Sequence, residues 1–408
     1  MHALKSFIAR DSFLAFADQV ISSGTNFCLT LLLAQKLDIK SFGIYASIVL
    51  FLYLLVSITN ALVIQPFQVI VVKIENKKQY ITTLFLGIVL LLFIPPILIA
   101  ILSQIFTKTG LFQVSPVDVI CFVTGFLIND FFRKLLLGLS RIKEVFVMDI
   151  LFLVLVALIF VLPKISLPQV LLFIGLSNLI ATLPGFFFMV KNYQKPIIWR
   201  LFVREHLKQG KWLLSVAVVQ WSSSNFFILV AGIYLGIEAL GALRLVQSFF
   251  GIINIGLQTI ENYFLPKIAL LYHQNSTAAK NYLLRLTLTG ACVFGVLTFL
   301  FFIFSNQIIV LAGGSKYQHY GYVIKMVAIL YFFIFLGYPI RIIVRVLMLN
   351  KIFFTGYLLS FIASLATFHF LLHYSGLYGA VAGLIGNQIV MILYWRYQLN
   401  KKQFQLWK

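Results

Sequence analysis

Long stretches without a charged residue dominate the pattern of this chain. No Asp, Glu, Lys or Arg occurs in residues 79–107, 165–190, 212–237, 286–315 or 352–395. A helix needs about 20 apolar residues to cross the hydrocarbon core of a bilayer, so each of the first four stretches is long enough for one crossing. The last stretch is long enough for two crossings, and Tyr374-Ser375-Gly376 predicts the turn between them.

The same pattern predicts an all-α, polytopic membrane protein with about twelve transmembrane helices. The runs of Leu, Ile, Val and Phe are continuous rather than alternating, so a membrane β-barrel is not expected. Residues 1–25 are predicted to be part of an uncleaved first helix, because Asp18 interrupts the apolar region that a signal peptide would need. The expected spans are 12–34, 43–65, 80–104, 115–137, 145–163, 168–190, 212–235, 241–262, 283–304, 322–346, 353–373 and 377–397.

The composition indicates that lipid is the main solvent. Of the 408 residues, 61% are hydrophobic and only 11% are charged, whereas soluble domains carry about 25% charged residues. Most of the 32 Lys and Arg residues fall in segments that are cytoplasmic if both termini are inside, as the positive-inside rule requires. We therefore assign the net charge of +21 to topology and to anionic lipid headgroups, and we expect no nucleic-acid partner.

An internal repeat divides the chain. Asn26 and Asn225, Gly43 and Gly241, and Pro66 and Pro266 are related by nearly the same sequence offset. Six crossings preserve orientation, so the repeats predict two six-helix bundles related by a pseudo-twofold axis along the membrane normal. The expected divisions are an N-terminal lobe at 1–190, a basic cytoplasmic linker at 191–211, a C-terminal lobe at 212–398 and a cytoplasmic tail at 399–408.

Several motifs resemble the O-antigen type polysaccharide and oligosaccharide flippases of the multidrug/oligosaccharidyl-lipid/polysaccharide exporter superfamily. The polar first helix and the F-G-x-Y start of the second are matched by Ser22–Phe27 and by Phe42-Gly43-Ile44-Tyr45. Leu265-Pro266 and Gly314-Ser315-Lys316-Tyr317 match two later motifs. The resemblance implies a flippase that moves an undecaprenyl-pyrophosphate-linked oligosaccharide across the bacterial cytoplasmic membrane. Its product would serve O-antigen (lipopolysaccharide), capsule or exopolysaccharide synthesis.

Arg244 is the strongest candidate for a substrate-binding residue. It lies about one turn inside the outer end of its span, where an arginine can also extend to the interface. Its context, Ala242-Leu243-Arg244-Leu245, is similar to that of a cavity arginine in related lipid II flippases. The resemblance therefore implies that its guanidinium binds a pyrophosphate in bidentate fashion.

Other polar residues inside the spans have two possible roles each. Asp18 either pairs with Arg10 or a cation of another helix, or it is a cavity charge that binds a coupling H+ or Na+. The amides Asn26, Gln220 and Asn225 either join helices or line a cavity for sugar hydroxyls.

Three basic residues on the tenth span complete the set of candidates. Lys325 either extends to the outer interface or contacts substrate. Arg341 and Arg345 share one helix face at the cytoplasmic rim, where they either anchor the helix or dock an anionic lipid carrier. The three cysteines lie far apart in apolar spans, so we expect no metal site and no cofactor beyond a coupling ion.

Three functions remain as alternatives. The first is alternating-access transport of the lipid-linked oligosaccharide, with a polysaccharide polymerase and glycosyltransferases as possible partners. The second is an H+ or Na+ coupled multidrug or small-molecule antiporter. The third, an oligosaccharide polymerase, is disfavoured because the longest expected outer loop, 305–321, contains no acidic residue for general acid–base chemistry. We therefore predict a transporter rather than an enzyme.

Overall fold

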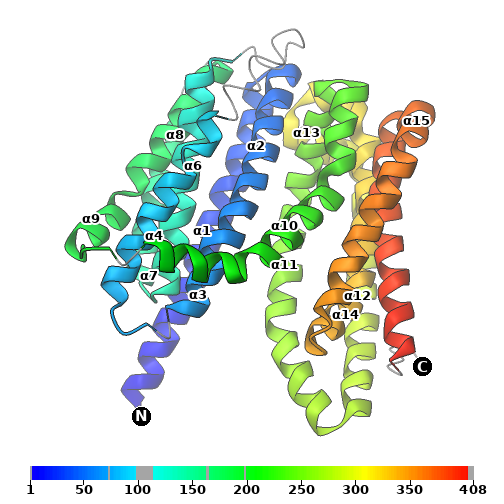
Figure 1. Ribbon diagram of the computed structural model, residues 1–408. Coiled ribbons are helices and arrows are strands. Elements are labelled where there is room, and N and C mark those ends of the chain that lie inside the picture. The colour runs from blue at the N-terminus through cyan, green and yellow to red at the C-terminus, as the bar shows by residue number, and fades with distance from the viewer. Residues whose placement is uncertain (1, 72–73, 98–113, 162–164, 197–198, 403–408) are drawn as a thin grey trace. The chain divides into compact units, whose positions relative to one another are not determined.

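The computed structural model describes residues 2–71, 74–97, 114–161, 165–196 and 199–402, and these are almost entirely helical (Figure 1). No strand occurs in these ranges, so the predicted all-α polytopic fold is confirmed. The helices are α1 (His2–Lys36), α2 (Ile39–Thr59), η1 (Asn60–Ile64), α3 (Gln65–Ile70), α4 (Lys77–Leu91), α6 (Pro116–Gly138), α7 (Ile142–Val161), α8 (Leu167–Ala181), α9 (Leu183–Lys191), α10 (Trp199–Leu235), α11 (Ile237–Gln274), α12 (Ser276–Ile303), α13 (Ser305–Gly313), η3 (Ser315–Tyr320), α14 (Gly321–Val346) and α15 (Asn350–Lys401).

The expected spans fall on these helices, apart from the ends of spans 80–104 and 145–163, parts of which lie outside the described residues. By length and composition alone, 7 helical segments of the described chain are apolar enough to cross a membrane. They are Ile39–Ile70, Lys77–Ile97, Leu167–Lys191, Gly210–Leu235, Ser276–Ile303, Ser315–Val346 and Asn350–Lys401.

Internal contacts divide the chain into two compact units. The first unit contains residues 1–37 and 48–218, and the second contains residues 38–47 and 219–408. The short segment 38–47 belongs to the second unit because Gly43 lies against the backbone of Ile237. The lobe boundaries expected from the sequence remain predictions.

In the first unit, α6 and α8 pack with their backbones in direct contact. A Cβ atom on Gly125 would collide with the carbonyl oxygen of Gly175, and one on Gly175 would lie 2.7 Å from the carbonyl of Cys121. Small residues allow such close helix approach in membranes. A buried core that includes Phe67, Tyr80 and other aromatic and aliphatic side chains packs the helices of this unit together.

The second span of the first unit is interrupted by the π-helix η1. Proline lacks an amide hydrogen, and Pro66 in the first turn of α3 directly follows this irregular segment. His206, from the start of α10, contacts it: the Nδ1 atom lies 3.1 Å from the carbonyl oxygen of Leu62. The other ring nitrogen, Nε2, lies 2.8 Å from the hydroxyl of Tyr80. Since a carbonyl can only accept, Nδ1 donates and Nε2 accepts the proton of Tyr80.

The beginning of α10 is therefore anchored to the first unit. Phe202 is buried in the same core, and its ring lies 4.2 Å from that of His206 between centroids. Burial lowers the pKa of His206, and its hydrogen bond to the Leu62 carbonyl acts in the opposite direction.

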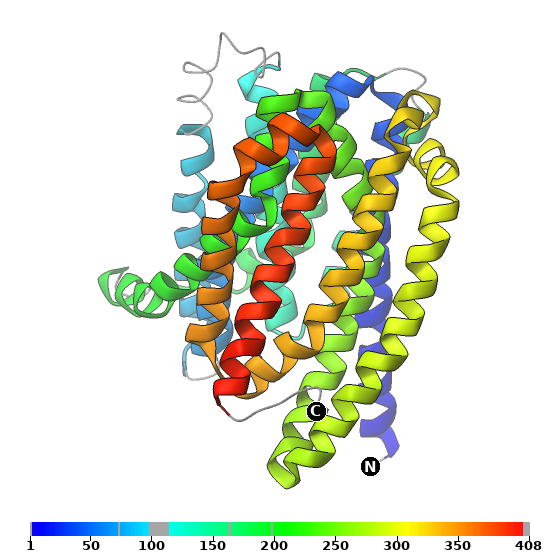
Figure 2. The ribbon, with the colours of Figure 1, turned by 90° about the vertical axis from the view of Figure 1, so that its right-hand side faces the viewer.

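The second unit is built on α14, which packs against both α12 and α15. Figure 2 shows α11 and α12 as one antiparallel pair and the two arms of α15 as another, and α14 contacts both pairs. The two arms of α15 meet at Gly376, whose φ of 52° confirms the predicted turn. The expected outer loop 305–321 instead forms α13 and η3, separated by Gly314 with a φ of 86°. Ile309 and Ala312 of α13 and Tyr317 of η3 are buried, which explains why this segment is ordered into helices.

Candidate functional site

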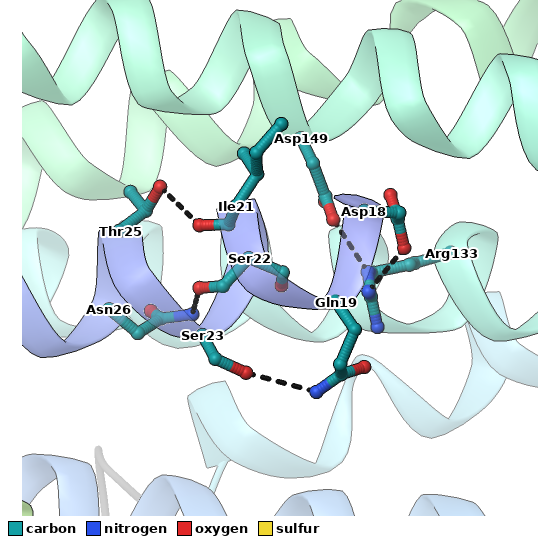
Figure 3. Close-up of polar contacts among 9 residues, drawn as sticks. All are labelled: Asp18, Gln19, Ile21, Ser22, Ser23, Thr25, Asn26, Arg133 and Asp149. Atoms are coloured by element: carbon teal, nitrogen blue, oxygen red, sulfur yellow. Dashed lines mark hydrogen bonds and ion pairs between the residues drawn. The ribbon is translucent and has the colours of Figure 1, made fainter. Parts of the chain in front are cut away.

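A charged cluster lies inside the first unit (Figure 3). Asp18 comes from α1, Arg133 from α6 and Asp149 from α7. The Nη2 atom of Arg133 is 2.7 Å from Oδ2 of Asp18, and its Nε atom is 3.0 Å from Oδ2 of Asp149. Asp18 is 2% exposed and Asp149 is 5% exposed. Two buried carboxylates therefore share one guanidinium, which leaves one excess negative charge when both are ionised.

The cluster keeps one unused acceptor. The Oδ1 atom of Asp18 is buried and has no hydrogen-bond partner among the described residues. A buried, unpaired carboxylate oxygen is costly unless it binds a proton or a cation. The cluster can therefore exchange one positive charge while Arg133 stays in place.

Lys134, the residue after Arg133 on α6, forms a second ion pair. Lys134 contacts Oδ2 of Asp130 at 2.6 Å and Oδ1 of Asn60 at 2.8 Å. Asn60 begins the π-helix η1, so this lysine joins α6 to the irregular segment. The pair neutralises Asp130, which lies four residues before Lys134 on the same helix.

Figure 3 also shows a different polar face of α1. Gln19 and Asn26 are exposed on the first unit, and Gln19 donates to the hydroxyl of Ser23 at 2.9 Å. Asn26 donates to the carbonyl of Ser22 at 2.9 Å. Exposing polar side chains of a membrane-spanning helix to acyl chains costs more free energy than exposing them to water or to a polar ligand.

The repeat-related asparagine of the second unit makes the same local contact. Asn225 on α10 donates to the carbonyl of Trp221 at 2.9 Å, as Asn26 does to Ser22. Both amides use their NH₂ group within their own helix. Neither of these hydrogen bonds joins one helix to another. Gln220 lies on the same helix and is half-buried.

Arg244 is half-buried on α11, near the start of the helix. Its Nη1 atom donates to Oε1 of Gln247 at 3.2 Å. The structure thus places the Arg244 guanidinium beside a neutral amide within the second unit.

The three basic candidates of α14 have different surroundings. The Nζ atom of Lys325 is 5.9 Å from the ring centre of Phe302. The guanidinium of Arg341 lies 5.5 Å from the ring of Tyr338 and 5.8 Å from that of Phe353, whereas Arg345 is exposed. Arg341 therefore packs against aromatic rings, and Arg345 is the more accessible of the pair.

Sequence reasoning missed the ionic partners of Asp18. Neither Arg133 nor Asp149 was selected from the sequence as a partner of Asp18. No spacing rule links residues this far apart in sequence. The only available signal was physical: a carboxylate inside an apolar span requires a partner. The three cysteines are free thiols.

Comparisons with known proteins define the fold. No protein-family model matches the chain, and no curated protein matches it in sequence. A solved structure of an inward-facing multidrug resistance MATE family transporter of the MOP superfamily matches with a TM-score of 0.76 at 11% identity. That match covers 94% of this chain and 95% of the other.

Two further solved structures match the chain. The lipid II flippase MurJ in an inward closed conformation has a TM-score of 0.73 at 14% identity, and covers 97% of this chain and 89% of that chain. A MOP superfamily transporter from Pyrococcus furiosus, described as having a binding pocket of reverse polarity, has a TM-score of 0.57 at 14% identity. The latter match covers 97% of this chain and 93% of that chain. The chain therefore has the fold of the MOP superfamily transporters, and the fold does not distinguish a flippase from a drug exporter.

Proposed function

We propose that this protein is a flippase for an undecaprenyl-pyrophosphate-linked oligosaccharide, working by alternating access. The cargo has an anionic pyrophosphate, a polar glycan and a long isoprenoid tail. No covalent chemistry is needed, because binding the two access states differently is enough to shift the equilibrium between them. The protein would act in a bacterial cytoplasmic membrane with both termini in the cytoplasm. Anionic lipids, a polymerase and glycosyltransferases are the partners we expect.

The charge arrangement carries this proposal. Asp18, Asp130 and Asp149, the described carboxylates well inside the spans, are all paired with Arg133 or Lys134. Arg244 lies in one of the expected spans, and its guanidinium donates to the neutral amide of Gln247. A site of this kind favours an anionic ligand over a cationic drug, since a guanidinium binds phosphate strongly.

Two observations add support. The fold is shared with MurJ, a protein described as a lipid II flippase, although a shared fold by itself does not determine function. The exposed amide face of α1, including Gln19 and Asn26, offers hydrogen-bonding groups that suit sugar hydroxyls. In this proposal Arg244 binds the pyrophosphate, and Asn26, Gln220 and Asn225 contact the glycan. Lys325, Arg341 and Arg345 contact the anionic carrier before or after passage.

The test compares cells lacking the gene with cells complemented by variants. We expect lipid-linked oligosaccharide to accumulate on the cytoplasmic leaflet without the gene, and the wild type to restore surface glycan. Arg244→Ala should reduce restoration at least about tenfold, because one charge-assisted contact to phosphate is lost. Arg244→Lys, which keeps the charge but not the bidentate geometry, should be intermediate. Accumulation of single repeat units on the outer leaflet would indicate a polymerase instead.

The charged cluster of the first unit favours a second candidate, an H+ or Na+ coupled antiporter. The unpartnered Oδ1 of Asp18 can take up one cation, and MATE family transporters share the fold. This candidate predicts altered drug tolerance with unchanged surface glycan in the deletion strain. Ion coupling through Asp18 is also compatible with the flippase, in which case Asp18→Asn would abolish dependence on the ion gradient and leave cargo binding intact.

A further inference from the structure

A polar stripe runs along the N-terminal half of α11 in the second unit. Arg244, Gln247, Ser248, Gly251 and Asn254 recur at intervals of three and four residues, which places them on one face of the helix. Each of these five residues is half-buried, so the stripe is open rather than packed away. Polar groups on a membrane-spanning helix usually face a partner or a wet cavity.

The stripe includes a gap between its polar groups. A Cβ atom built on Gly251 would meet no atom within 4 Å. Ser248 precedes Gly251 by about one helical turn. Its hydroxyl donates a hydrogen bond to the carbonyl oxygen of Arg244 at 2.8 Å, within the same helix. From Arg244 to Asn254 the helix rises by about 15 Å, which is enough for a phosphate group and the first sugars of a glycan.

The two amides are held in opposite senses. Gln247 accepts from Arg244 through Oε1, which leaves its NH₂ group as a donor. Asn254 donates through Nδ2 to the hydroxyl of Tyr331 at 2.7 Å, which leaves its carbonyl oxygen as an acceptor. Neither remaining group has a protein hydrogen bond among the residues that the structure describes. Tyr331 itself is buried against Phe250, so its position is fixed.

A purely structural role does not account for this arrangement. The bond between Arg244 and Gln247 lies within one helix and joins nothing to α11. Asn254 does join α11 to α14, but only through one half of its amide. A donor and an acceptor separated by an open gap match the hydroxyl groups of a sugar, which both donate and accept.

We infer that Gln247 and Asn254 form a sugar subsite next to the phosphate-binding Arg244, with Tyr331 as the residue that positions Asn254. This inference rests on the proposed function and extends it from the pyrophosphate to the glycan. The subsite binds the sugars adjacent to the carrier phosphate, whereas Arg244 binds the phosphate that all such carriers have. Substitutions of the amides and of Arg244 should therefore have different effects on the binding of carriers with and without sugar.

The experiment uses full-length protein in nanodiscs and two probes. One probe is the lipid-linked oligosaccharide extracted from cells lacking the gene, and the other is undecaprenyl pyrophosphate without sugar. Gln247→Leu and Asn254→Leu should weaken binding of the oligosaccharide probe about tenfold each, and that of the bare carrier less than about twofold. Arg244→Ala should weaken both probes about tenfold.

Two controls accompany these variants. Tyr331→Phe keeps the Asn254 amide but removes the hydroxyl that orients it, and should weaken the oligosaccharide probe about threefold. Thr287→Val removes a hydroxyl that only serves the carbonyl of Leu283 on α12, and should change neither probe. Equal loss of both probes in Gln247→Leu and Asn254→Leu, or no loss, overturns the subsite and leaves the flippase intact. If no oligosaccharide accumulates in the deletion strain, or the wild type binds neither probe, the proposed function falls, and the subsite falls with it.

Discussion

The two units differ in the polar groups that join the helices in their interiors. In the first unit, α1 contacts α7, and a charged cluster of Asp18, Asp149 and Arg133 joins these two helices to α6. In the second unit, the repeat-related helix α10 meets the two arms of α15 through neutral groups. Ser223 lies 2.5 Å from Ser360 between hydroxyl oxygens, and Ser364 donates to Oδ1 of Asn387 at 2.7 Å.

The neutral cluster is closed on itself. Asn387 donates through Nδ2 to the carbonyl of Ser223 at 2.9 Å, and Ser364 is within 2.9 Å of the carbonyl of Ser360. Ser360 and Ser364 are 0% exposed. This cluster has no titratable group, so it holds its helices together regardless of pH or ion gradient. Of the two clusters, only the charged one can respond to a proton or a cation, and the response to an ion gradient would then belong to the first unit.

The largest effect should come from removing the shared cation. Arg133→Met leaves Asp18 and Asp149 buried together without their guanidinium. We expect the free energy of unfolding to fall by about 3–5 kcal/mol, because a buried charge that loses its partner is strongly destabilising. Thermal unfolding of the detergent-purified protein measures the change.

A compensated variant controls this experiment. Adding Asp18→Asn and Asp149→Asn to Arg133→Met removes the unpaired charges and should restore most of the lost stability. If the single and triple variants unfold at the same temperature, the cluster is not an electrostatic unit, and the contrast with the second unit fails.

The matching change in the second unit should cost less. Asn387→Leu leaves the carbonyl of Ser223 and the hydroxyl of Ser364 without the bonds that Asn387 supplies. We expect a loss of about 1–3 kcal/mol, the usual cost of unsatisfied neutral polar groups in a protein interior. Unfolding curves for this variant should have the same dependence on pH as those of the wild type. If Asn387→Leu lowers the free energy of unfolding as much as Arg133→Met does, the neutral cluster is as sensitive to disruption as the charged one.

The smallest effect concerns pH. Burial lowers the pKa of His206, so the neutral ring is the form that fits between Tyr80 and the Leu62 carbonyl. As pH falls below the ordinary value of about 6.5, the unfolded chain takes up the proton first, and the folded state loses stability. The loss continues until the lowered pKa is reached, and amounts to at most about 1.4 kcal/mol per pH unit.

His206→Gln tests this assignment, because glutamine can donate to the Leu62 carbonyl and does not titrate. The variant should lose less stability than the wild type between pH 7.5 and 5.5, measured by thermal unfolding. Parallel curves for the two proteins would assign the acid sensitivity of the first unit to other groups.

The sequence predicted the positions of the helices well, since a charge-free apolar run of sufficient length has few alternatives. The turn at Gly376 could also be predicted, because two crossings had to be separated at that point. Local irregularities could not. The π-helix at Asn60–Ile64 depends on packing around Lys134 and His206, and α13 formed where a loop was expected because Ile309 and Ala312 are buried there.

The candidate site shows the same limit. Arg244 could be selected from its unusual position in an apolar span, but its contact with Gln247 and the role of Asn254 required coordinates. Asp18 was recognised as requiring a partner, but the choice between Arg10 and a cation of another helix depended on tertiary packing. The structure places Arg133 in that role and adds Asp149. Long-range pairs of this kind leave no periodic trace in a single sequence.

The sharing of one guanidinium by two carboxylates restricts the order in which relatives of this chain can lose the cluster. Neutralising either aspartate first leaves a balanced pair of one carboxylate and Arg133, a state that the fold can tolerate. Losing the arginine first passes through two unpaired buried anions. Descendants that carry a neutral residue at position 133 should therefore already have lost an acid at position 18 or 149. Loss of an aspartate is expected to precede loss of the arginine.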